Sequence, residues 1–239
     1  MTAKRYLIIN ADDFGQSIGV NRGITKAHQR GVVTSASLMV RWPAAARAAA
    51  YCREHPSLSL GLHLDLGEWV YRDGTWVALY EVVPFNDPGE IVEEIFRQLA
   101  TFRRLTGKDP THIDSHQHVH RQEPIRGITV DIARKLHIPL RHYNSAIYYC
   151  GEFYGQTEEG LPYPDGITVD RFIKILEELP PGFTELGCHP GEGKDLDTMY
   201  RNEREEEVKV LCDPNVQSAI VDLGTKLCSF ADFAEATHK

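Results

Sequence analysis

Cysteine is scarce in this 239-residue chain, and its five cysteines are widely spaced without a Cys-x-x-Cys motif. An odd number at such spacing favours neither a disulfide framework nor a thiolate zinc site. No apolar run approaches the ~20 residues of a membrane span. The apolar stretch that follows residues 1–5 covers only residues 6–9, which is too short for the core of a signal peptide. We therefore expect a cytoplasmic protein without a membrane partner.

Basic runs are also absent, and 26 Lys and Arg residues face 34 Asp and Glu residues, for a net charge of -8. Such a balance argues against a nucleic-acid partner, whose phosphates require clustered positive charge. Apolar residues make up 42% of the chain, which is enough for an ordinary globular core. The length fits one α/β barrel, so we expect a single domain over residues 1–239. A homodimer is an open expectation, since nothing in the sequence identifies an interface.

Short apolar runs alternate with longer segments of helical period, and this pattern predicts an α/β fold with a mainly parallel sheet. The predicted strands are residues 6–11, 35–40, 58–66, 111–115, 139–143, 183–188 and 226–229. The predicted helices are residues 20–30, 44–53, 90–105, 124–135, 170–178 and 200–210.

Residues 67–88 and 145–166 have no clear period and are rich in Gly, Pro and aromatic residues. We expect loops there, and loops this long in a compact domain are lids, binding loops or insertions. Their aromatic rings could stack on a sugar in a substrate cleft or simply pack the loops down. Both interpretations stay open at this point.

Two carboxylates, Asp12 and Asp13, directly follow the first predicted strand. Catalytic groups of parallel α/β folds gather at the carboxyl ends of strands. Adjacent anions leaving an apolar strand are costly unless a cation or hydrogen-bond donors hold them. The alternative is a turn or helix cap built by Asp13 and Gly15.

The third predicted strand, residues 58–66, carries His63 and Asp65 near its carboxyl end. The two-residue alternation of a strand places both side chains on one face. A lone histidine on a strand is more often a core residue than a ligand, but this one again lies at a strand end.

Residues 111–120 form the least ordinary run, with polar ionisable residues at every even position: His112, Asp114, His116, His118 and His120. If the run is extended, His112 and His116 lie ~13 Å apart, too far to bind one ion together. The position at the strand end favours His116 as a ligand. We expect His112 and Asp114 to lie deeper and to orient it.

His189 follows the sixth predicted strand in the sequence Gly-Cys-His-Pro-Gly, which indicates a general acid or base. An aspartate together with His63 and His116 is a ligand set that suits zinc, iron(II), manganese or nickel. Such an ion acidifies water and polarises an amide carbonyl, the two effects that amide hydrolysis needs.

With these residues identified, the sequence resembles the YdjC-like carbohydrate deacetylases, the family that includes chito-oligosaccharide deacetylase. The run His-Ile-Asp-Ser-His-Gln-His-Val-His is the specific part of the match. The matching blocks are residues 10–15 with Asn21 and Gly23, then 31–35, 61–63, 111–120, 189–191 and 213–232.

The resemblance implies a deformed, incomplete β/α barrel of about seven parallel strands, similar to polysaccharide deacetylases. It also implies that Asp13, His63 and His116 bind one divalent metal ion, with Asp12 as the base and His189 as the acid. The family is described as magnesium-dependent, whereas two imidazole ligands are better suited to zinc or a similar transition ion. Both metals remain open.

The predicted function is a metal-dependent hydrolase that removes the acetyl group from an N-acetylated amino sugar or a short chito-oligosaccharide and releases acetate. One alternative is metal-dependent hydrolysis of another amide or of a phosphoester, because the ligand set does not identify the bond. A second alternative is a sugar-binding barrel without turnover.

Overall fold

The computed structural model describes residues 4–237. Residues 1–3 and 238–239, at the ends of the range expected to form one domain, lie outside the described residues. The strands of the main sheet are β1 (Arg5–Phe14), β2 (Ser35–Leu38), β3 (Ser59–Leu64), β6 (Ile113–Ser115), β7 (Ile147–Cys150), β8 (Gly182–Cys188) and β9 (Thr225–Cys228). All of their pairings are parallel, in the order β6-β3-β2-β1-β8-β7, and β9 pairs with β1.

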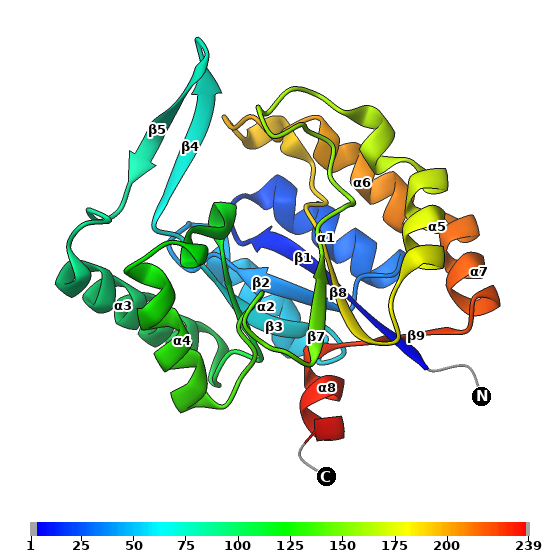
Figure 1. Ribbon diagram of the computed structural model, residues 1–239, viewed down its shortest axis with the longest axis horizontal. Coiled ribbons are helices and arrows are strands. Elements are labelled where there is room, and N and C mark those ends of the chain that lie inside the picture. The colour runs from blue at the N-terminus through cyan, green and yellow to red at the C-terminus, as the bar shows by residue number, and fades with distance from the viewer. Residues whose placement is uncertain (1–3, 238–239) are drawn as a thin grey trace.

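β1 lies at the centre of this sheet (Figure 1). β8 pairs with β1 from Arg5 to Ala11, while β9 and β2 share the other edge of β1, β9 at its beginning and β2 at its end. Beyond the edge strand β6, Leu140 forms an isolated parallel bridge with Ile113, and β7 pairs with β8 at the opposite edge. Residues 141–146 therefore connect the two edges of a curled half-barrel, which confirms the predicted fold class.

Helices surround the curled sheet (Figure 1). They are α1 (Ile18–Arg30), α2 (Ala45–Glu54), α3 (Pro88–Thr106), α4 (Ile125–Leu136), α5 (Val169–Glu178), α6 (Glu203–Leu211), α7 (Pro214–Asp222) and α8 (Phe230–Thr237). The longest, α3, begins where the Asp87 side chain accepts from the backbone N–H groups of Gly89 and Glu90 and ends at left-handed Gly107. Within residues 4–237, no helix is long and apolar enough to cross a membrane.

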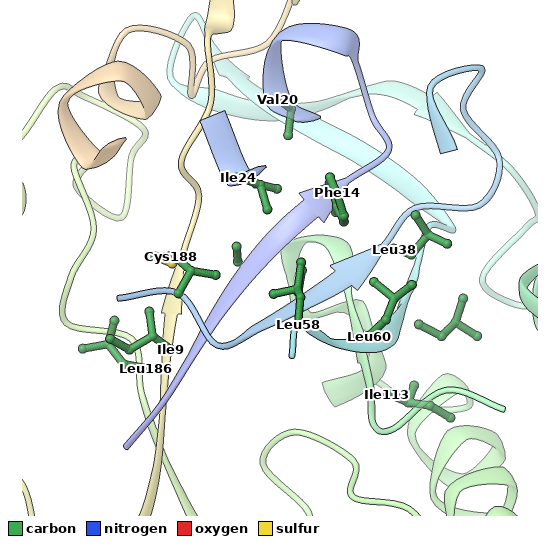
Figure 2. Close-up of a cluster of buried hydrophobic side chains, with 14 of the residues drawn as sticks. Ile9, Phe14, Val20, Ile24, Leu38, Leu58, Leu60, Ile113, Leu186 and Cys188 are labelled. Atoms are coloured by element: carbon green, nitrogen blue, oxygen red, sulfur yellow. The ribbon is translucent and has the colours of Figure 1, made fainter. Parts of the chain in front are cut away.

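The main core lies between the sheet and these helices. Figure 2 shows Val20 and Ile24 of α1 beside Phe14 at the end of β1, with Leu38 and Leu60 of the neighbouring strands close by. Along β3, Leu60, Leu62 and Leu64 belong to this core, whereas the alternating residue His63 lies on the other face of the sheet.

The prediction of a strand at residues 139–143 is wrong. Apart from the bridge at Leu140 this segment is a turn, and the strand of this region, β7, lies at Ile147–Cys150 within the stretch expected to be a loop. The polar residues Arg141 and His142 interrupt the apolar run, and His142 has a positive φ of 67° that a strand does not allow.

The expectation of a loop over residues 67–88 is also wrong for most of that stretch. β4 (Gly67–Arg72) and β5 (Thr75–Glu81) form an antiparallel hairpin whose tip projects from the rest of the molecule (Figure 1). β5 is exposed along most of its length, so it lacks the apolar alternation that reveals a half-buried strand. The helices α7 and α8 were not predicted.

Replacement of Leu60 by alanine should lower the free energy of unfolding by about 2–5 kcal/mol, since it removes a fully buried side chain from the core. Urea denaturation followed by circular dichroism measures this change. The control Val221→Ala alters an apolar residue that is 74% exposed and should stay within about 0.5 kcal/mol of the unaltered chain. Equal effects of the two substitutions would contradict the core described above.

Candidate active site and metal centre

The end of β1 departs from regular strand geometry where it carries the two aspartates. The pairing of β1 with β2 shifts register between Ala11 and Phe14, and Asp13 has a φ of 65°. A regular strand would direct Asp12 and Asp13 to opposite faces. The irregularity instead brings both buried carboxylates to the same cavity, a use of bulges that is common beside active sites.

Asp13, His63 and His116 converge around one carboxylate oxygen. Oδ1 of Asp13 lies 3.2 Å from Nε2 of His63 and 3.0 Å from Nδ1 of His116, and all three residues are buried. They come from the ends of β1, β3 and β6. Because the carboxyl ends of parallel strands lie at the same edge of the sheet, residues that are 50 or more positions apart in the chain meet there.

The register of β3 and β6 determines how His63 is oriented. His63 pairs with Asp114 across the two strands, and Nδ1 of His63 lies 2.8 Å from Oδ1 of Asp114. This contact leaves Nε2 of His63 directed at Asp13. Asp114 therefore orients His63 and not His116, contrary to the expectation from the sequence.

His112 does not orient His116 either, so that expectation is wrong. One ring nitrogen of His112 contacts the Ser37 hydroxyl at 3.0 Å and the other contacts the Thr111 hydroxyl at 2.9 Å. The imidazole is also stacked on the ring of Phe230, with 3.7 Å between the two ring centroids. His112 is thus part of the packed interior below the site.

The histidine run turns away from the strand direction after Ser115. Residues His116–Arg121 form the 3-10 helix η1, in which Gln117 and His118 both have positive φ angles. His116 is consequently the first residue beyond the strand, and the residues after it leave the common face that an extended run would have shared.

Charge stabilises the ionised form of Asp13. Burial works to raise its pKa, but the positive charges of Arg204 and His116 hold it well below the usual range. Nη2 of Arg204 lies 2.6 Å from Oδ2 of Asp13 and leaves Oδ1 to face the histidines. Arg204 itself is fully buried on α6, and no motif in the helical sequence around it reveals this role.

Asp12 is held by Arg141, a residue that the sequence analysis did not identify as part of the site. Two guanidinium nitrogens of Arg141 donate to the two oxygens of Asp12, at 2.6 and 2.8 Å. The side-chain amide of Asn10 donates a further hydrogen bond to Oδ1 of Asp12 at 2.8 Å. The carboxylate is thereby held in one orientation at the cavity wall.

Arg141 reaches the site because Leu140 bridges Ile113, which places Arg141 beside Asp114. Nη2 of Arg141 lies 2.7 Å from Asp114 and 2.6 Å from Glu185 of β8. Burial raises the pKa of Glu185 to about 7 although Arg141 acts to lower it. A lone arginine after the apolar Ile-Pro-Leu segment was the signal available in the sequence.

His189 lies beside Asp12 because Ala11 and Cys188 pair in the register of β1 and β8. Nε2 of His189 is 3.8 Å from Oδ2 of Asp12. Burial lowers the pKa of His189 to about 4, so its imidazole is neutral near pH 7.

Glu207 of α6 supports His189 from the other side. It accepts hydrogen bonds from the backbone N–H of His189 and from the Tyr200 hydroxyl, and its Oε1 lies 3.9 Å from Nδ1 of His189. Burial raises the pKa of Glu207 to about 8.

The candidate site opens into a cavity of about 840 Å³. Asp12, Asp13, His63, His116 and His189 all line it. Residues 67–88 and 145–166 both contribute to its walls, so the two stretches of unclear period face the site. The aromatic rings of the lining are Trp69, Trp76, Phe85, Tyr149, Phe153, Tyr154 and Tyr200.

His118, His120 and His142 form another group with ligand atoms close together. Nδ1 of His120 contacts the Ser115 hydroxyl at 2.6 Å, and Nε2 contacts the carbonyl oxygen of Arg141 at 3.1 Å. Both nitrogens of His120 are thus engaged, and Nε2 of His118 lies 3.5 Å from the Tyr149 hydroxyl, so this group is the weaker candidate. A third group consists of Asp12, His63 and Asp114, whose two carboxylates are paired with Arg141.

The residues around Asp13 fit a divalent metal ion. Two imidazole nitrogens and a carboxylate oxygen form a donor set typical of zinc and similar ions. The hydrogen bond from His63 to Asp114 is the usual second contact of a metal-binding histidine. Asp13, His63 and His116 are all buried, and both imidazoles face the Asp13 carboxylate, so one cation could contact all three side chains.

The half-barrel carries its Asp-His-His cluster at the carboxyl ends of the strands, and the solved structures that share this fold include carbohydrate esterases and deacetylases. The fold is shared with a family 4 carbohydrate esterase from Streptomyces lividans, at a TM-score of 0.55 and 12% identity over 95% of this chain and 93% of the other. A crystal structure from Enterococcus faecalis has a TM-score of 0.74 at 26% identity and covers 97% of this chain and 99% of the other.

The chain belongs to the family of YdjC-like proteins, whose model matches residues 6–222. A carbohydrate deacetylase from Geobacillus stearothermophilus is 35% identical over 96% of this chain and 98% of its own length. A chitooligosaccharide deacetylase from Serratia marcescens is 32% identical over 96% and 99%, respectively. The predicted family and the prediction of a deacetylase enzyme are confirmed.

The substitutions Asp13→Ala and His63→Ala should each reduce bound metal to well under one ion per chain, because each removes a donor from the buried set. Elemental analysis of the purified protein after zinc loading and gel filtration measures the content. The control His142→Ala, in the second histidine group, should retain the full content. Loss of metal in the control with retention in Asp13→Ala would locate the ion in the other group.

The raised pKa of Glu207 makes stability depend on pH. The folded state holds the proton up to about pH 8, whereas an unperturbed glutamate releases it near 4.5. Stability should therefore fall as the pH rises between these values. Between pH 5 and pH 8 the free energy of unfolding, measured by urea denaturation, should fall less in Glu207→Gln than in the unaltered chain. The control Glu206→Gln alters an exposed neighbour and should keep the original dependence; an unchanged profile in Glu207→Gln would contradict the assignment.

Proposed function

We propose that this protein is a metal-dependent hydrolase that removes the acetyl group from an N-acetylated amino sugar or a short chito-oligosaccharide. The observation that carries the proposal is the convergence of His63 and His116 on one oxygen of Asp13, with Asp12 and His189 beside them in the same cavity. The site thus combines candidate metal ligands with two groups that can exchange protons.

A divalent ion held by Asp13, His63 and His116 would polarise the acetyl carbonyl and acidify a water molecule. Two imidazole nitrogens favour zinc or a similar transition ion over magnesium, which prefers oxygen ligands. The ion pair with Arg204 keeps Asp13 ionised and correctly turned for this role.

Asp12 is proposed as the general base. Its two oxygens accept from Arg141, so the carboxylate cannot rotate away from the cavity. Fixed orientation matters because a general base acts only within hydrogen-bond reach of the proton that it removes.

His189 is proposed as the general acid that protonates the departing amine. Because burial lowers its pKa to about 4, it is neutral before the reaction and must first receive a proton. Asp12 is the nearest proposed source, since Oδ2 of Asp12 and Nε2 of His189 are 3.8 Å apart. The proton taken up by Asp12 would thus be passed to Nε2 of His189 and then to the nitrogen of the leaving group.

The aromatic lining of the cavity supports a carbohydrate substrate, because sugar rings stack on aromatic faces. Trp69 of β4, Tyr149 of β7 and Tyr154 after β7 all line the cavity. The names of the relatives, carbohydrate deacetylase and chitooligosaccharide deacetylase, indicate the same substrate class.

Metal-stripped protein should release acetate from N-acetylglucosamine or N,N'-diacetylchitobiose only after a divalent ion is restored. Zinc, magnesium, manganese and nickel are supplied separately, and acetate is measured enzymatically. His116→Ala should release none with any ion. Acetate release by His116→Ala equal to that of the unaltered protein would refute the site.

Asp12→Asn should keep its metal and lose turnover by about 10²- to 10⁴-fold, the usual contribution of a general base. Metal analysis and acetate release on the same preparation separate the two properties. Normal turnover of Asp12→Asn would exclude Asp12 as the base. If the unaltered protein releases no acetate with any ion, other amides and phosphoesters become the substrates to test.

A further inference from the structure

Two buried polar atoms without hydrogen-bond partners face each other at the edge of the metal site. They are Oε2 of Glu68, on the hairpin strand β4, and Nε2 of His116. Among residues 4–237 neither atom has a hydrogen-bond partner, and the distance between them is 3.7 Å. The side chains of Glu68 and His116 are only 6% and 11% exposed, so bulk water does not readily satisfy them.

His63 and His116 each direct one ring nitrogen at Asp13 and the other at a second carboxylate, but the two histidines use opposite nitrogens for these contacts. His63 presents Nε2 to Asp13 and Nδ1 to Asp114, whereas His116 presents Nδ1 to Asp13 and Nε2 to Glu68. A neutral imidazole whose Nδ1 binds a metal ion carries its proton on Nε2. Glu68 therefore stands where the N–H of His116 would be directed.

The backbone next to Glu68 is held in place from the His116 side. Trp69 donates its backbone N–H to Oε1 of Gln117 at 2.8 Å, and Nε2 of Gln117 donates to the Trp69 carbonyl at 2.8 Å. Gln117 directly follows His116 and has a φ of 48°. Reciprocal bonds thus join the residue after His116 to the residue after Glu68.

The base of the hairpin is also fixed to the body of the protein. Asp65 accepts hydrogen bonds from the Tyr80 hydroxyl at 2.9 Å, from Arg41 at 2.8 Å and from the indole N–H of Trp42 at 3.0 Å. Asp65, which the sequence analysis placed on the face of His63, instead anchors β5. The hairpin therefore presents Glu68 as a fixed wall of the cavity.

We propose that Glu68 is a positioning residue for the candidate metal centre. Its Oε2, now 3.7 Å from Nε2 of His116, would accept a hydrogen bond from the N–H at that nitrogen when the ion is bound and so aim Nδ1 of His116 at the ion. Asp114 does the same for His63 from the sheet. The proposal rests on the metal centre of the proposed function and adds that the hairpin β4–β5, through Glu68 and the Gln117 clamp, determines metal affinity. Partners of this kind typically contribute 10- to 100-fold to metal binding.

The test is the dissociation constant for zinc, measured by competition with a chromophoric chelator on the metal-stripped protein. Glu68→Gln has nearly the same shape and should weaken zinc binding at least 10-fold, because its amide cannot replace the carboxylate as an acceptor of full strength. Gln117→Ala, which removes the clamp, should shift the affinity in the same direction. The matched control is Asp73→Asn, which removes a charge at the hairpin turn and should stay within twofold.

Cobalt(II) substitution adds a readout that a merely structural role would not change. In Glu68→Gln the visible absorption bands should shift in position while their intensity remains that of the same coordination number. Thermal unfolding by circular dichroism shows whether each variant is folded, and Gln117→Ala supplies a second measurement if Glu68→Gln is not.

Unchanged zinc affinity and an unchanged cobalt spectrum in folded Glu68→Gln would overturn the proposal. A change in coordination number would also overturn it, since it would make Glu68 a direct ligand. Failure of the proposed function looks different: the unaltered protein would bind zinc with the predicted dependence on Glu68 and release no acetate.

Discussion

The ion-pair network of Arg141 is the interaction on which the rest of the structure depends. This buried guanidinium contacts Asp12 of β1, Asp114 of β6 and Glu185 of β8 at 2.6 to 2.7 Å. Strands β6 and β8 are far apart in the order of the sheet, so one side chain can contact both only if the sheet is curled. Because an unpaired buried charge is very costly, the network stabilises the curled form against a flat one.

The candidate metal centre inherits its geometry from this network. Asp114 contacts Arg141 through Oδ2 and His63 through Oδ1, which connects the arginine to a candidate ligand through a single carboxylate. The same arginine also holds Asp12, which directly precedes Asp13 in the chain. A second buried arginine, Arg204, neutralises Asp13 from α6. Positive charges from outside the strand ends therefore allow several carboxylates to share a small buried volume.

Much of the fold could be predicted from the sequence, because buried parallel strands and amphipathic helices leave strong local patterns. The candidate ligands were found for a related reason: Asp13, His63 and His116 are polar residues that end apolar runs. Arg141 also ends an apolar run, Ile-Pro-Leu, but it was missed because the segment 139–143 was predicted to continue as a strand. Glu68 was missed because it lies in a stretch that was expected to be a loop. The roles of Asp114 and His112 were assigned incorrectly, because register between β3 and β6 decides that Asp114 meets His63.

By itself the sequence determined the family, the parallel α/β architecture and the residue types of the site, since these depend on local pattern and on motifs that do not require distances. The tertiary structure decided which atoms meet. The register of β1, β3, β6 and β8 pairs Asp12 with His189 and His63 with Asp114. The turn after Leu140 delivers Arg141, and the hairpin delivers Glu68. Contacts between residues distant in the chain depend on register and curl, which no local pattern encodes.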